Sequence, residues 1–153
     1  MNYSNYFYFL SICVFLLATF LLVTGSPLLL LEIGNAGFPF GTLITWLGVI
    51  ALPLAIYFGS SKLQRPTGKT MRIFRLILLI MIVLACSWGF VSYFLAANWS
   101  FSFSNRATHF RGSPAAAWYF WRYAYLVGGL PFAFLLVFWI YKLILKWKKK
   151  AVN

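Results

Sequence analysis

The sequence predicts an all-α integral membrane protein, a four-transmembrane-helix bundle with both termini in the cytoplasm. Two features of its composition point to this class. Hydrophobic residues make up 63% of the 153 residues and charged residues only 9%, whereas a soluble domain averages about 25% charged residues. Basic residues outnumber acidic ones by 13 to 1, and they gather in short segments beside long apolar runs, which is typical of proteins oriented in a membrane by Lys and Arg.

Four apolar segments are long enough to cross a bilayer, because a spanning helix needs roughly 20 mostly apolar residues. We expect one membrane domain, 1–153, with spans at about 6–25, 41–59, 73–97 and 123–145. The first span is expected to be retained rather than cleaved as a signal peptide. No Lys or Arg precedes it, and its apolar run exceeds the roughly 7–15 residues of a signal-peptide core.

The connection between the first two spans, 26–40, contains Pro27, Gly34 and Pro39 among other helix breakers. Such residues stop a continuous helix, so we expect an outer turn with a short interfacial piece. The same connection holds Glu32, the sole carboxylate side chain of the sequence. Two interpretations of Glu32 stay open: an interfacial acid that reaches water or forms one structural salt bridge, and a contact for a ligand or partner.

The second connection, 60–72, is polar and basic, and a second basic segment follows the fourth span. Placing both inside leaves ten of the thirteen basic residues in the cytoplasm and three outside, which fits the accumulation of Lys and Arg in cytoplasmic loops. We expect these side chains to contact anionic lipid headgroups. The candidates are Lys62, Arg65, Lys69, Arg72, Lys146, Lys148, Lys149 and Lys150.

Small residues recur at helical spacing on the second and third spans. Lipid is as apolar as Leu, so membrane helices associate where small side chains let their backbones approach closely. We therefore predict a helix-packing seam between these two spans, although Gly and Ala are also common in membrane helices generally. The seam residues are Gly48, Ala51, Ala55, Ala85, Gly89, Ser92 and Ala96.

An aromatic and basic outer loop is predicted between the third and fourth spans, at about 98–122. Ser113 and Pro114 fit a helix start, with Ser as the cap and Pro at the first helical position, and this helix is expected to continue into the fourth span. The loop fits an aromatic belt at the lipid headgroups, and it also fits a docking surface for a partner or an anionic ligand. The contact candidates are Glu32, Arg106, His109, Arg111, Trp118, Trp121 and Arg122.

Residues that usually perform catalysis are scarce. The sequence has one Glu, one His and two Cys, which excludes paired carboxylates, two-metal sites and relays built on several acids. We predict no catalytic residue, no metal site and no cofactor. Cys13 and Cys86 fall within apolar spans at different depths, and we expect both to be small packing residues.

These features predict a non-enzymatic protein that acts by contact, as an accessory or assembly subunit of a larger membrane complex or as an immunity-type protein. A small oligomeric transporter or channel is the alternative, and an enzyme that acts on a lipid substrate through Glu32 and His109 is the weakest candidate. The expected partners are membrane lipids and other membrane subunits, without nucleic acid, and a homo-oligomer is left open. The expected location is the bacterial plasma (inner) membrane.

Overall fold

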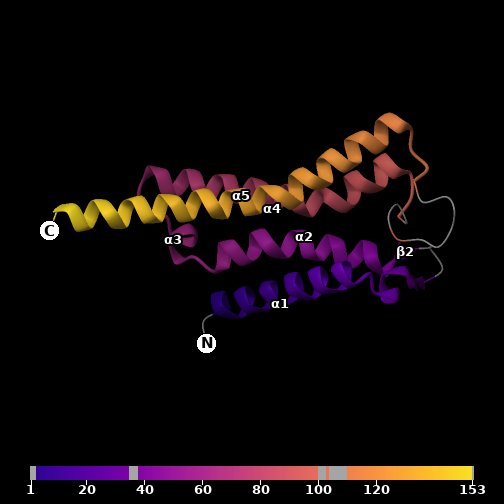
Figure 1. Cartoon of the computed structure of the whole chain (residues 1–153), viewed down its shortest axis with the longest axis horizontal. Helices are drawn as coiled ribbons and strands as arrows, with labels where there is room; N and C mark the ends of the chain where they lie inside the picture. The colour runs from indigo at the N-terminus through magenta and orange to yellow at the C-terminus, as the bar shows by residue number, and fades with distance from the viewer. Residues whose placement is uncertain (1–2, 35–37, 100–102, 104–109, 153) are drawn as a thin grey trace.

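Four long helices dominate the computed structural model, which describes residues 3–34, 38–99, 103 and 110–152 (Figure 1). Each of the four is long and apolar enough to cross a membrane, so the prediction of four helices with the length and composition of membrane spans is confirmed. They are α1 (Tyr3–Thr24), α2 (Phe40–Phe58), α4 (Lys69–Ala96) and α5 (Pro114–Val152).

The helices extend beyond the predicted spans where polar residues still favour helix. α4 begins at Lys69 rather than near 73, because the basic residues of its first turn are good helix formers. α5 begins at Pro114, where the Ser113 hydroxyl oxygen accepts a hydrogen bond of 3.2 Å from the backbone N–H of Ala116. The predicted cap and helix start are therefore confirmed. α5 then continues without interruption through Pro131.

Short elements fill the connections at both ends of the helices. Between α1 and α2, a 3-10 helix η1 (Pro27–Leu30) precedes an antiparallel pair of two-residue strands, β1 (Glu32–Ile33) and β2 (Phe38–Pro39). Between α2 and α4, the predicted polar loop contains a one-turn helix, α3 (Ser61–Gln64). Leu63 of α3 is 0% exposed, so a single apolar side chain anchors this basic connection to the helices.

α2 lies at the centre of the packing. It contacts α1, α4 and α5, while α4 packs along α5 and α1 packs chiefly on α2 (Figure 1). Three buried clusters follow from this order. The first cluster joins α2, α3, α4 and α5 and includes Leu63, Leu78 and Phe138. The second joins α4 to α5 around Trp88. The third joins α1, η1 and α2 around Ala18.

All seven residues of the predicted seam are buried, and the two glycines among them face different helices. A Cβ atom added to Gly48 would lie 2.6 Å from the Cβ of Ala18, so Gly48 faces α1. On α4, a Cβ added to Gly89 would lie 2.5 Å from the ring of Trp46 in α2. A large side chain, rather than a second small one, therefore fills the space that the α4 glycine leaves.

The prediction that Cys13 and Cys86 are packing residues is wrong. Both thiols are free and both residues are exposed on the outer surface of the helices. A small, weakly polar side chain tolerates an exposed position on an apolar helix.

Candidate functional site

Basic side chains gather at one end of the helices. The N-terminus, α3 and the C-terminal part of α5 lie together at this end, whereas η1, β1 and β2 lie at the other (Figure 1). We call the first the basic end and define it by Lys62, Arg65, Lys69, Arg72, Lys142 and Lys146, all of which are exposed. The other end is the β1–β2 end.

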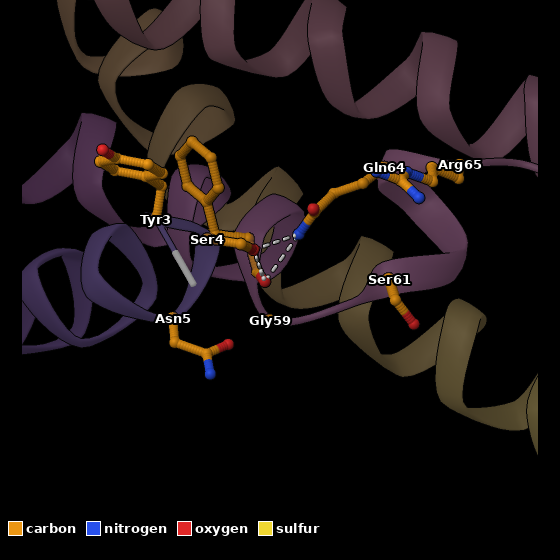
Figure 2. Close-up of a pocket in the computed structure, with 8 residues that line it drawn as sticks. Tyr3, Ser4, Asn5, Gly59, Ser61, Gln64 and Arg65 are labelled. Atoms are coloured by element: carbon orange, nitrogen blue, oxygen red, sulfur yellow. Dashed lines mark hydrogen bonds between the residues drawn. The ribbon is translucent and has the colours of Figure 1, made fainter. Parts of the chain in front are cut away.

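A polar pocket of about 600 Å³ opens at the basic end. The first turn of α1, the last turn of α2 and α3 enclose it, and Figure 2 shows the side chains of Ser4 and Gln64 pointing toward each other across it. The described residues that line it are Tyr3, Ser4, Asn5, Phe58, Gly59, Ser61, Gln64 and Arg65.

Gln64 holds this pocket together. Its side-chain amide donates hydrogen bonds to the Ser4 hydroxyl oxygen at 2.7 Å and to the Phe58 carbonyl oxygen at 2.9 Å, with a longer contact of 3.4 Å to the Tyr57 carbonyl (Figure 2). Ser4 in turn donates to the Phe58 carbonyl at 3.2 Å. The last carbonyls of a helix have no partner within the helix, so Gln64 satisfies the end of α2 and ties it to the start of α1.

The chemistry available in this pocket is hydrogen bonding and attraction of negative charge. Among the described residues that line it there is no Asp, Glu, His or Cys, so no side chain is placed to act as a general base for the Ser4 hydroxyl. Sequence analysis missed the pocket. Two signals were available: Ser4 and Asn5 at the start of an otherwise apolar span, and the amide of Gln64 within a basic connection.

A second candidate surface lies on the first turns of α5. Trp118, Trp121, Arg122 and Tyr125 follow one another at steps of three, one and three, so they share one side of the helix. The three aromatic side chains are 49%, 50% and 72% exposed in that order, and Arg122 is exposed as well. We call these four residues the α5 aromatic face.

The four side chains of the α5 aromatic face contact one another in two pairs. The guanidinium carbon of Arg122 lies 3.4 Å from the centroid of the Trp118 ring, which is a cation–π contact. Trp121 and Tyr125 stack with their centroids 5.8 Å apart. The buried residues of α5, among them Phe120, lie on the other side of the helix, so the aromatic face takes no part in the internal packing.

The remaining predicted contact residues are dispersed. Glu32 lies exposed in β1, and Arg111 is exposed while its backbone N–H donates a 3.0 Å hydrogen bond to the carbonyl of Ala96. Arg106 and His109 lie outside the described residues. The structure therefore brings together Trp118, Trp121 and Arg122 from the predicted set.

Most of the predicted lipid-contacting residues lie at the basic end. Lys62, Arg65, Lys69, Arg72 and Lys146 are exposed there, whereas the side chains of Lys148, Lys149 and Lys150 lie outside the described part. No group of three or more His, Cys, Asp or Glu that could hold a metal ion occurs among the residues that the structure describes. No protein-family model, curated protein or solved structure matches this chain.

Proposed function

We propose that this chain is a non-enzymatic membrane protein that acts by protein contact, as an accessory or assembly subunit of a larger membrane complex. The observation that carries this proposal is the α5 aromatic face. Trp, Tyr and Arg are the residues on which binding energy concentrates at protein interfaces. Here four of them occupy one side of one helix, exposed and in contact with one another in two pairs.

The position of this face along α5 makes it accessible to a partner. α5 has 39 residues and is therefore about 58 Å long, well beyond the roughly 30 Å of a hydrocarbon core. Residues 123–141, between Arg122 and Lys142, carry no charged side chain and measure about 28 Å. If these residues fill the core, Trp118 and Arg122 lie at the membrane surface, within reach of a soluble domain or a neighbouring membrane subunit.

An aromatic belt would also place Trp and Tyr at this level, so the experiment must separate lipid anchoring from protein contact. A photo-crosslinking amino acid is introduced in place of Trp121 in the full chain, which is then irradiated in its native membrane and purified in mild detergent. The matched control carries the same group in place of Phe94, which is 79% exposed on α4. We expect a discrete adduct with a different membrane protein from position 121 and none from position 94.

Two further variants test whether the contact holds the complex together. Replacing both Trp118 and Arg122 by Ala should release the partner during purification, while Trp147→Ala, which removes a Trp that is 72% exposed near the basic end, should not. Adducts with lipid alone, or with a second copy of this chain alone, would contradict the accessory role. A self-adduct would direct the next experiments to ion and solute flux.

A further inference from the structure

A groove runs along one side of α2 between α1 and α5. Three hollows of about 240, 320 and 450 Å³ make it up. Leu52 lines both the innermost hollow and the middle one, and Gly59, Ser60 and Lys142 line both the middle hollow and the one at the basic end. The three hollows therefore adjoin one another along α2, and we call them together the α2 groove.

Apolar residues of α2, two of them small, form the floor of the groove, and side chains of α1 and α5 form its walls. Gly48, Leu52 and Ala55 lie on the floor at steps of four and three, so one helical side of α2 faces the opening. Phe15 of α1 approaches Phe132 of α5 with their ring centroids 6.2 Å apart. A Cβ atom added to Gly128 of α5, which also lines the groove, would meet nothing within 4 Å.

The interior of the groove suits a hydrocarbon chain rather than water. Thr19 and Thr45 both line the innermost hollow. Each hydroxyl donates a 2.8 Å hydrogen bond to a carbonyl of its own helix, Thr19 to Phe15 and Thr45 to Gly41. These two hydroxyl donors are already satisfied, so this part of the groove offers an apolar surface.

The mouth of the groove is cationic. Lys62 of α3 and both Lys142 and Lys146 of α5 line the hollow at the basic end, together with Ser60 and Ser61. The Lys142 ammonium nitrogen lies 4.5 Å from the centroid of the Phe138 ring, which also lines the groove. The single carboxylate side chain of the sequence is in β1 at the other end, so no acidic side chain offsets the three lysines.

We propose that the α2 groove binds one anionic phospholipid, with its phosphate among Lys62, Lys142 and Lys146 and an acyl chain along Leu52 toward Gly128. Basic pockets between membrane helices are the usual sites for anionic headgroups. The distance along α5 from Lys142 to Gly128 is about 21 Å. This length exceeds the hydrocarbon depth of one leaflet, about 15 Å. The groove is therefore long enough for a long acyl chain. This lipid site is independent of the α5 aromatic face.

The test is lipid retention measured by native mass spectrometry. The full chain is reconstituted into vesicles of equal parts phosphatidylglycerol and phosphatidylcholine, extracted in mild detergent and weighed with the lipid that remains bound. We expect one retained phosphatidylglycerol. Replacing Lys142 and Lys146 by Gln should lower its retention about 25-fold, since each lysine near an anionic surface contributes on the order of fivefold.

Two matched controls accompany these variants. One separates headgroup binding in the groove from a general effect of positive charge, and the other separates loss of acyl-chain binding from the effect of replacing a glycine in a helix. Lys69→Gln with Arg72→Gln removes the same charge from exposed positions of α4 that do not line the groove. These two residues are expected to contact headgroups at the surface only, so their loss should lower retention of the bound lipid much less than the loss of Lys142 and Lys146. Gly128→Leu should lower retention about fivefold by filling the groove. Gly129→Leu is the control, because it adds the same side chain in equally open space on the exposed surface.

A further comparison uses short-chain phosphatidylglycerol. Its chains do not extend to Gly128, so its retention should be the same in both glycine variants. Equal retention of phosphatidylcholine and phosphatidylglycerol would overturn the proposal. So would equal losses from the two pairs of charge variants. Equal effects of the two leucine variants would overturn the placement of the acyl chain. Circular dichroism and size-exclusion profiles verify that each variant is folded.

Discussion

Gln64 illustrates how one polar side chain organises a helix end in a protein with very few polar residues. It supplies donors to the carbonyls of Tyr57 and Phe58, and it also fixes the hydroxyl of Ser4. The start of α1, the end of α2 and α3 therefore meet at one amide, and Ser4 is 60 residues away from Gln64 in the sequence. The sequence cannot predict this, because the neighbours of Gln64 depend on where α1 begins relative to the end of α2.

Gln64→Met is expected to destabilise the protein, because it keeps the approximate shape of the side chain and removes both donors. Leaving part-buried carbonyls without a partner costs about 1–3 kcal/mol. The measurement is thermal unfolding in a single detergent, followed by circular dichroism. Thr67→Met, in the exposed part of the same connection, is the control. Equal melting temperatures for the two variants would contradict the capping role.

Two serines of α4 give opposite predictions. The Ser92 hydroxyl is buried and has no hydrogen-bond partner in the part of the chain that the structure describes, whereas the Ser87 hydroxyl lies 2.8 Å from that of Tyr123 and 2.9 Å from the Leu84 carbonyl. Ser92→Ala should therefore raise stability by up to about 1 kcal/mol and Ser87→Ala should lower it by a similar amount. Denaturant titration compares them, and a loss from Ser92→Ala would show that its hydroxyl is in fact satisfied.

At the scale of elements, one part of the contact between α2 and α4 places a large side chain against a glycine. The ring of Trp46 in α2 lies over Gly89 of α4. The indole N–H of Trp46 also donates a 3.0 Å hydrogen bond to the carbonyl of Cys86, which is likewise in α4. The ring also packs edge-on against Phe90, with centroids 5.1 Å apart. Trp46 therefore fixes the rotation of α4 relative to α2 through both packing and a hydrogen bond.

Gly89→Ala is expected to disrupt this contact. The added methyl group would lie 2.5 Å from the Trp46 ring, and overpacking of this kind costs about 1–3 kcal/mol. Gly129→Ala places the same methyl group in open space and should stabilise the helix by up to about 1 kcal/mol. Unfolding followed by tryptophan fluorescence measures both. A gain in stability from both variants would mean that Trp46 moves aside without loss.

Local rules account for the elements that sequence analysis predicted correctly. Long apolar runs predict the four spans, and a Ser cap followed by Pro predicts the start of α5 at Pro114. Small residues predict buried positions as well, but not which helix each one faces. Gly48 meets α1 rather than α4, because the pairing of helices depends on the shapes of all their surfaces together. The polar pocket and the α2 groove were missed for the same reason.

At the scale of the whole molecule, the charge distribution predicts the orientation in the membrane. The positive-inside rule places the basic end in the cytoplasm. In a chain with Cys13 and Cys86 replaced by Ser, a cysteine at Thr67 should react with a membrane-impermeant maleimide only after the membrane is permeabilised. A cysteine at Ile33, which is exposed in β1, should react in intact cells. The reverse pattern would invert the topology.

The order of packing has a consequence for how the chain reaches the membrane. α1 packs chiefly on α2 and α4 packs along α5, so the molecule consists of two helical hairpins whose members are neighbours in the sequence. If all four helices cross the bilayer, each hairpin begins and ends on the same side, and we expect its two helices to associate within the membrane through their own contacts. A gene divided within the connection at 65–68 should therefore yield two fragments that insert separately and co-purify through the contact between Trp46 and Gly89.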